Sequence, residues 1–195
     1  MISLCKPFRL TKDNCTKIKK IFADQMDKGL SADATVRKSS CLLMENTFMS
    51  RFPTGKETGH YLSLDLGSTN FRVIMSRLHG HETEDEFSVK YYDVADNLRV
   101  GSYVPLFDFL AECIDDFLSG EEGLKGKKIP LGFSFSYPMV QQSADSGFLV
   151  TWTKSYDLPD AIGKDAVQLL RDALEKRGVS SVQKHFVILS MHVVA

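Results

Sequence analysis

The sequence predicts an α/β protein built around a mixed β-sheet, and three observations support this class. The chain has 195 residues and is 43% hydrophobic, which is enough to bury a core. Three strand-like runs follow one another between residues 61 and 94, and helical and strand-like patterns alternate after residue 105. We therefore expect a mixed, five-stranded sheet with flanking helices in residues 61–195, preceded by an N-terminal helical segment in residues 1–60.

The N-terminal segment carries a helical pattern that ends at a glycine. Between Thr11 and Lys28, apolar residues recur at helical spacing, and Gly29 is the expected stop. These residues are Cys15, Ile18, Phe22 and Met26. A weaker helical pattern covers residues 32–49. Residues 51–60, RFPTGKETGH, are rich in Pro, Gly and Thr and predict a loop.

The first strands are expected to form an antiparallel meander. YLSLDL (61–66) and FRVIMSRL (71–78) flank the turn Gly67-Ser68-Thr69-Asn70, which predicts a β-hairpin. EFSVKYYDV (86–94) predicts a third strand of the same sheet.

The second half of the chain alternates helix and strand. Pro105 opens an amphipathic helix that ends before Gly120. Residues 128–138, KIPLGFSFSYP, alternate apolar and small polar side chains, which predicts a strand with one apolar face. After the turn SADSG, residues 147–154, GFLVTWTK, predict the fifth strand, and residues 165–177 predict a final amphipathic helix.

Composition argues against two classes of partner. The 24 Lys and Arg residues nearly balance the 25 Asp and Glu residues, so the chain lacks the positive field that nucleic acids and anionic membranes attract. No apolar run has the length of a membrane span. The cysteines Cys5, Cys15, Cys41 and Cys113 are scattered without disulfide or metal spacing, which favours reduced thiols. We expect a cytoplasmic protein that binds small molecules or other proteins.

The hairpin turn has the composition of an anion-binding site. Backbone N–H groups can hold a phosphate chain only where the side chains are small, and Gly67, Ser68 and Thr69 meet this condition. Asp65 would then lie beside the phosphates and hold Mg²⁺ through bound water. The alternative is an ordinary hairpin turn in which Asp65 caps backbone donors. A P-loop is excluded, because the sequence lacks the pattern G-x-x-x-x-G-K-[ST].

Two further segments place polar side chains at predicted strand ends. Pro138 stops the fourth strand directly after Ser136 and Tyr137, which leaves hydroxyl groups at an edge suited to a neutral, hydroxyl-rich ligand. Thr153 and Lys154 end the next strand, where a lysine can place a positive charge near a transferring phosphoryl group. The alternative for each segment alone is plain sheet structure, with the lysine in solvent.

Taken together and in this order, LSLDLGSTNFRV (62–73), LGFSFSYP (131–138) and LVTWTK (149–154) resemble the hexokinases and glucokinases, members of the actin-like ATPase superfold. The resemblance covers about residues 10 to 180. It implies that residues 61–195 form the small, ribonuclease H-like lobe of such an enzyme. It also implies ATP-dependent phosphorylation of a glucose-like hexose at the 6-hydroxyl, the first step of glycolysis, with ATP and Mg²⁺.

The same resemblance implies roles for individual residues. Asp65 would support Mg²⁺. The residues expected around the ATP phosphates are Asp65, Gly67, Ser68, Thr69, Asn70 and Arg72. The residues expected at the sugar are Ser136, Tyr137, Pro138, Thr153 and Lys154. Lys154 would also face the transferring phosphoryl group, so Lys154 and Asp65 are the expected catalytic residues.

The chain departs from the family pattern at three places. Ser68 stands where the family usually has a second glycine, and Tyr137 replaces the usual phenylalanine. The family continues to an Asn-Asp-Thr sequence whose Asp takes the proton of the 6-hydroxyl. An ungapped count places that Asn-Asp pair at Leu189 and Ser190, so this catalytic base is expected to be absent.

Two hypotheses follow for the function. In the first, the chain is a hexokinase by descent that holds the smaller lobe and the N-terminal helices, as a splice product, a shortened gene model or a fragment. It would bind sugar or nucleotide weakly, with little turnover, because the large lobe and its closing motion are missing. In the second, the chain is a non-catalytic, hexokinase-like binding or regulatory protein that meets a partner through the uncovered lobe face.

Overall fold

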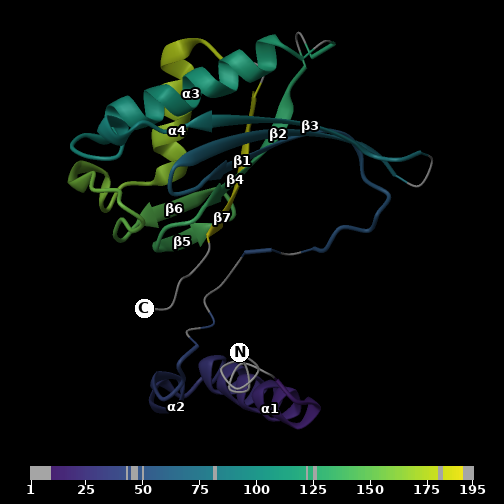
Figure 1. Ribbon diagram of the computed structural model, residues 1–195, viewed down its shortest axis with the longest axis vertical. Coiled ribbons are helices and arrows are strands. Elements are labelled where there is room, and N and C mark those ends of the chain that lie inside the picture. Colours follow the sequence, from purple (N-terminus) through teal and green to yellow (C-terminus); the bar gives the residue numbers. More distant parts are fainter. Residues whose placement is uncertain are drawn as a thin grey trace, which may run out of the picture. The chain divides into compact units, whose positions relative to one another are not determined.

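The structure, a computed structural model, describes residues 10–42, 44, 48–49, 51–80, 83–121, 123–124, 127–179 and 182–190. The chain divides into two compact units, Met1–Asn46 and Thr47–Val193. Within the described residues, the first unit is helical and the second holds every strand (Figure 1).

The first unit contains the helices α1 (Lys12–Gly29) and α2 (Ala34–Lys38). The predicted first helix is confirmed, with the Thr11 hydroxyl accepting a hydrogen bond from Asn14 N as its N-cap. Gly29, however, is the last helical residue and not the stop. A Cβ at Gly29 would lie 2.3 Å from Leu42 O, so this glycine is needed for a close approach of the chain.

The helix predicted over residues 32–49 is shorter than the sequence pattern suggested. It ends at Lys38, because the chain then turns back to α1. The Ser40 hydroxyl donates a hydrogen bond to Gln25 O at 2.6 Å, and the Gln25 side chain accepts one from Cys41 N at 3.0 Å. The bond from Cys41 N takes up a backbone donor that a continued helix would need.

The second unit is built on a five-stranded mixed sheet with the order β3-β2-β1-β4-β7. Its strands are β1 (Thr58–Leu66), β2 (Asn70–His79), β3 (Glu86–Asp93), β4 (Ile129–Phe135) and β7 (Val182–Ser190). Strands β1, β2 and β3 pair antiparallel, whereas β1, β4 and β7 are parallel neighbours. The predicted α/β class with a mixed five-stranded sheet is confirmed.

One strand of this sheet differs from the prediction. The segment predicted as the fifth strand, residues 147–154, contributes only to β6 (Ser146–Leu149), which pairs with β5 (Met139–Ser143) as a separate hairpin. The chain leaves the main sheet after β4 because Tyr137 N turns back to Phe135 O and Pro138 has no N–H to donate. Strand β7 takes the fifth place instead, in parallel register with β4.

The core lies between one face of the main sheet and the helices α3 (Tyr103–Ser119) and α4 (Ala166–Arg177), which contact each other (Figure 1). Short 3-10 helices, η2 (Asp96–Leu98) and η3 (Pro159–Ala161), flank them. Helix α3 begins two residues before the predicted Pro105, because the Ser102 hydroxyl supplies the N-cap. Helix α4 ends as predicted, at a left-handed Gly178 with φ 79°. No helix among the described residues is long and apolar enough to cross a membrane.

Cys113 on α3 provides a test of this packing. The residue is 2% exposed, and burial raises the pKa of its thiol to about 12, from an ordinary value near 9. Burial of the neutral thiol therefore stabilises the folded state fully below about pH 9. This contribution is lost as the pH rises towards 12. At about pH 8, iodoacetamide should modify exposed Cys15 and Cys41 in the native chain but modify Cys113 only after unfolding. Mass spectrometry of the peptides measures this, and alkylation of native Cys113 as fast as Cys41 would contradict the packing.

Candidate active site at the ends of the parallel strands

The carboxyl ends of the three parallel strands meet at one edge of the sheet. Leu66 of β1 is in register with Phe135 of β4, which is in register with Ser190 of β7. Ligands of α/β sheets commonly bind at this edge, outside the strand ends. The turn after β1 and the segment after β4, both predicted as site elements, lie here. Leu189 and Ser190, the positions of the missing Asn-Asp pair, also lie here, at the end of β7.

The predicted hairpin turn is confirmed, with Asn70 already the first residue of β2. Gly67 N donates a hydrogen bond to Asn70 O at 2.9 Å, which closes the turn. A Cβ at Gly67 would lie 3.2 Å from that same oxygen, so any larger residue would crowd the bond. Ser68 and Thr69 are exposed at the tip. The bend is thus narrow, glycine-dependent and open to solvent.

Strand β3 braces the turn from the side. Thr69 O accepts a hydrogen bond from Val94 N at 2.8 Å, and the Asn70 amide donates one to Asp93 Oδ1 at 2.8 Å. The Thr69 hydroxyl in turn donates to Asn70 Oδ1 at 2.8 Å. These bonds therefore hold the Thr69-Asn70 side of the turn before any ligand arrives.

Asp65 and Arg72 face each other across the two strands that lead into the turn. They are register partners, and Arg72 Nη2 donates to Asp65 Oδ2. This hydrogen bond is the main cause that raises the pKa of the Arg72 guanidinium. The Asp65 side chain is 22% exposed and that of Arg72 is 45% exposed. A carboxylate and an accessible guanidinium thus stand side by side at the base of the turn.

The segment predicted to line the sugar site reaches directly to this turn. Ser136 is 8% exposed and Tyr137 is fully buried, both directly after β4. The Tyr137 hydroxyl donates a hydrogen bond to Gly67 O at 3.1 Å. Two segments about 70 residues apart in the sequence are therefore joined by one hydrogen bond.

Lys154 lies in a turn and not at a strand end, which corrects the sequence prediction. Strand β6 ends at Leu149, and Tyr156 N closes a turn by donating to Thr153 O at 3.2 Å. Lys154 and Ser155 occupy the two central positions with φ of 56° and 66°. The Lys154 side chain is exposed, yet its Nζ lies 5.3 Å from the centre of the Tyr137 ring. The third predicted segment therefore also converges on Tyr137.

An aromatic cluster packs against these segments. Trp152 is 8% exposed, stacks on Tyr156 with ring centres 5.4 Å apart, and meets the Tyr137 ring edge-on at 4.7 Å. The indole N–H donates to Leu158 O at 2.8 Å. Trp152 is thus a core residue. As the single tryptophan of the chain, it is also an optical reporter next to the predicted sugar segment.

Arg99 is a neighbour of the site that the sequence did not indicate. Its Nη1 donates to the Ser155 hydroxyl at 3.1 Å, and its carbonyl accepts from Asp157 N at 2.7 Å. Arg99 also pairs with Asp96. These contacts brace the turn that presents Lys154. A single arginine in a loop, 56 residues from its partner, gives no spacing signal that could have identified it.

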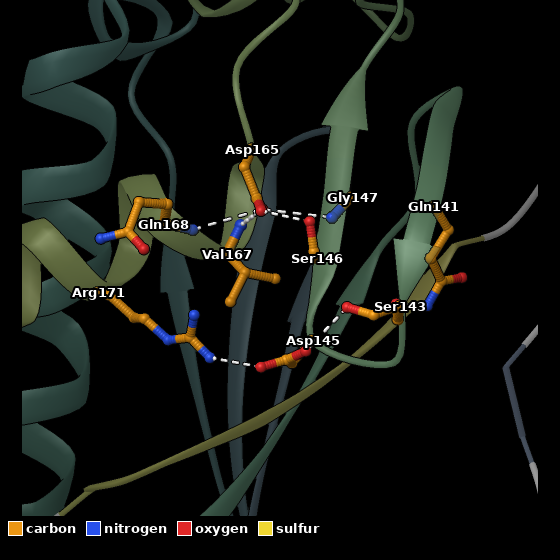
Figure 2. Close-up of polar contacts among 9 residues, drawn as sticks. All are labelled: Gln141, Ser143, Asp145, Ser146, Gly147, Asp165, Val167, Gln168 and Arg171. Carbon is orange, nitrogen blue, oxygen red and sulfur yellow. Dashed lines mark hydrogen bonds and ion pairs between the residues drawn. The ribbon is translucent and has the colours of Figure 1, made fainter.

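The β5–β6 hairpin connects the two predicted sugar segments and is held at its other end by α4. At its base, Val150 N donates to Pro138 O at 2.9 Å. Figure 2 shows the opposite end, where Asp165 contacts both β6 and the first turn of α4, and Asp145 pairs with Arg171 at 3.1 Å. The hairpin therefore ties the sugar segments to the helical layer.

The side chains near the turn suit a metal ion that is coordinated mainly by phosphate and water oxygens. Within the part of the chain that the structure describes, no group of three or more His, Cys, Asp or Glu side chains could hold a metal ion. Mg²⁺ bound to phosphates takes most of its oxygens from phosphate and water and needs only one or two carboxylates. The single carboxylate of Asp65 fits that requirement.

Comparison with known proteins identifies relatives of the whole chain. The family model described as Hexokinase matches residues 1–195. Hexokinase-1 of Homo sapiens is 40% identical over 171 residues, which cover 87% of this chain and 18% of that protein. Hexokinase-3 of Homo sapiens is 39% identical over 171 residues, which cover 88% of this chain and 18% of the relative. The chain thus spans about a fifth of the length of these relatives.

Solved structures show the same relationship. The hexokinase from Schistosoma mansoni complexed with glucose is 32% identical, with a TM-score of 0.75, covering 97% of this chain and 41% of that chain. A second hexokinase crystal structure is 29% identical, with a TM-score of 0.76, covering 94% of this chain and 43% of the other. The structural matches thus cover most of this chain and about two fifths of each solved chain. The chain belongs to the hexokinase family.

Proposed function

We propose that this chain provides the phosphate-binding turn and part of the sugar site of an ATP-dependent hexose 6-kinase, and that it binds a glucose-like hexose. The observation that carries the proposal is the convergence on Tyr137. Its hydroxyl contacts Gly67 in the turn at 3.1 Å, and Lys154 lies 5.3 Å above its ring. The turn proposed to hold the phosphates, the segment rich in hydroxyl groups and Lys154 thus converge near one edge of the sheet.

The proposed roles follow from the chemistry of each group. The small residues Gly67, Ser68 and Thr69 let backbone N–H groups approach the phosphates, and Asn70 and Arg72 flank them. Asp65 would hold Mg²⁺, which supplies neutralisation of phosphate charge when bound. Ser136, Pro138 and Thr153 would face the hexose, and the fully buried Tyr137 would support this segment from inside the fold. Lys154 would stabilise negative charge on the transferring phosphoryl group. We also propose a cytoplasmic location, because the scattered cysteines favour reduced thiols.

A titration of the full chain with glucose, followed by Trp152 fluorescence, tests this proposal. We expect a saturable change, because Trp152 contacts Tyr137. Lys154→Met should weaken glucose binding about tenfold or more, because a charge-assisted hydrogen bond contributes about 1.5–3 kcal/mol. The substitution keeps the alkyl stem over the ring and removes only the charge.

Lys164→Met is the matched control for this titration. Lys164 also lies over a tyrosine ring, that of Tyr103 at 4.2 Å, but belongs to neither predicted sugar segment. Its substitution should leave glucose binding unchanged. Equal responses to glucose and to glycerol, or equal effects of the two substitutions, would contradict the proposed sugar site.

A second candidate function is non-catalytic binding of a protein partner, and one observation favours it. Three large side chains on the edge strand β3 are exposed: Phe87 by 63%, Val89 by 46% and Tyr91 by 64%. They alternate along the strand and so share one face of the sheet. A coupled assay for glucose-dependent ADP release separates the two functions. Turnover that Lys154→Met abolishes supports the kinase, whereas a flat trace with a stable protein complex supports the binding function.

A further inference from the structure

Tyr137 links the proposed sugar segment to the proposed phosphate turn through its hydroxyl group. The residue is fully buried, and its ring packs against Phe135, Trp152 and Tyr156 with centres 4.9, 4.7 and 5.3 Å away. A ring held on several sides has little freedom to point its hydroxyl elsewhere. The hydrogen bond to Gly67 O at 3.1 Å is therefore a defined feature of the fold.

The contact with Gly67 O determines the direction of the next backbone donor. Gly67 O and Ser68 N–H belong to one peptide unit, which is planar and trans, so the two groups point in opposite directions. With Gly67 O directed at Tyr137, Ser68 N–H is directed away from the aromatic cluster. Ser68 lies at the exposed tip of the turn, where the proposed phosphates would bind. The Tyr137 hydroxyl, in the proposed sugar segment, thus sets the direction of Ser68 N–H, in the proposed phosphate-binding turn.

The other hydrogen bonds of the turn do not restrain the Gly67-Ser68 peptide unit. Gly67 N is bonded to Asn70 O at 2.9 Å, and Thr69 O is bonded to Val94 N at 2.8 Å. These bonds fix the two ends of the turn but do not involve the Gly67-Ser68 peptide unit. Glycine imposes few limits on the backbone torsions that rotate this unit. The bond from Tyr137 is therefore the contact that holds its orientation.

We propose that Tyr137 is a positioning residue which orients Ser68 N–H and thereby couples the hexose and nucleotide subsites. This proposal rests on the proposed function. A hexose bound to the segment from Ser136 to Pro138 would shift the backbone that carries the phenol, and the hydrogen bond to Gly67 O would pass this shift to the Gly67-Ser68 peptide before the nucleotide binds. By linkage, the nucleotide then strengthens hexose binding by the same factor.

The donor remains available over the working pH range. Burial raises the pKa of the Tyr137 phenol, so the hydroxyl stays protonated and can donate to Gly67 O. The neighbouring Tyr156 phenol, and to a smaller extent the negative charge of Asp65, raise this pKa further. The proposed coupling should therefore not vary between about pH 6 and pH 9, well below the ordinary phenol pKa of about 10.

Tyr137→Phe removes the hydroxyl and keeps the ring, so it isolates this one bond. Glucose affinity is measured by Trp152 fluorescence with and without saturating MgADP, and ADP affinity by calorimetry with and without glucose. In the unmodified chain we expect each ligand to strengthen the other about fivefold, the scale of one neutral hydrogen bond. In Tyr137→Phe both ligands should still bind alone, with the coupling reduced to about onefold.

Tyr156→Phe is the matched control. Its hydroxyl is buried in the same cluster and interacts with that of Tyr137, but among the described residues it makes no bond to the turn, so the fivefold coupling should persist. If the unmodified chain binds neither ligand, the proposed function is wrong. Three other results would show that the function stands but the role of Tyr137 is wrong, provided that both ligands bind. They are full coupling in Tyr137→Phe, loss of coupling in Tyr156→Phe as well, and no coupling in the unmodified chain.

A measurement on the unmodified chain keeps the proposal testable if Tyr137→Phe does not fold. In a ¹⁵N-labelled sample, adding glucose without nucleotide should shift the Ser68 amide resonance together with the Tyr137 amide. Shifts confined to the segment around Tyr137, with Ser68 and Thr69 unchanged, would overturn the proposed link.

Discussion

Replacing Phe133 with alanine is expected to lower the free energy of unfolding of the second unit by about 3–5 kcal/mol. Phe133 is fully buried in β4, in register with Leu64 of β1 on one side and Ile188 of β7 on the other. Its ring centre lies 5.3 Å from that of Phe135. Strands on both sides prevent the backbone from collapsing into the space left by the ring, so most of the cavity should remain.

Urea unfolding followed by Trp152 fluorescence measures this loss, because the only tryptophan lies in the second unit. Phe87→Ala provides the control. It removes the same ring from the edge strand β3, where Phe87 is 63% exposed, and should change stability by less than about 0.5 kcal/mol. Equal losses in the two variants would show that β4 is not the centre of the core.

The parts of the fold that the sequence predicted are those determined by local chemistry. The pattern of KIPLGFSFSYP predicted one apolar face, and Leu131, Phe133 and Phe135 are indeed all buried. The hairpin around Gly67 was predicted from small residues between two strands, and the turn needs that glycine for its closing hydrogen bond. Such features depend on neighbours within a few residues, so a single sequence contains the required information.

The errors occur where distant contacts override local preference. The sequence VTWTK has the composition of a strand, yet Lys154 and Ser155 adopt positive φ without being glycine or asparagine. Their conformation is held by Arg99, whose guanidinium and carbonyl bond Ser155 and Asp157. Likewise, the convergence on Tyr137 depends on which strands are neighbours, and a linear pattern does not specify strand order. The residue patterns therefore predicted the site as separate segments, and only the family resemblance implied that these segments meet.

Asp165→Ala is the second substitution with a large expected effect, a loss of about 2–3 kcal/mol in the free energy of unfolding. Figure 2 shows that one carboxylate serves two elements. It accepts from Val167 N at 2.9 Å and Gln168 N at 3.4 Å as the N-cap of α4, and from the Ser146 hydroxyl at 2.7 Å and Gly147 N at 3.3 Å in β6. Loss of a cap costs about 1 kcal/mol, and partly buried donors left unpaired add about 1–2 kcal/mol.

Two further variants separate these contributions. Asp165→Ser keeps an N-cap acceptor but is too short to serve β6 as well, so it should recover about 1 kcal/mol of the loss. Asp172→Ala removes another carboxylate of α4, one that is exposed and, among the described residues, accepts only from the Gln168 side chain at 2.6 Å. It should cost less than about 0.5 kcal/mol. Urea unfolding of all three variants gives the comparison. A loss for Asp165→Ala no larger than for Asp172→Ala would contradict the double role of the carboxylate.

The same substitutions test whether the hairpin positions the proposed sugar site. Asp165 holds one end of β6, while at the other end the Val150 N–H bonds Pro138 O at 2.9 Å, between the two proposed sugar segments. Asp165→Ala removes one of the contacts at the far end, while Asp145 still pairs with Arg171 at 3.1 Å and Ile188 N still bonds Ala144 O at 2.8 Å, so it should weaken glucose binding only about twofold at temperatures where the chain is still folded. Asp165→Ser, which restores the helix cap but not the contact with Ser146, should bind glucose as weakly as the alanine variant although it is more stable. If affinity instead follows stability across the series, the hairpin contributes to folding alone, and the sugar segments are positioned by the aromatic cluster around Tyr137.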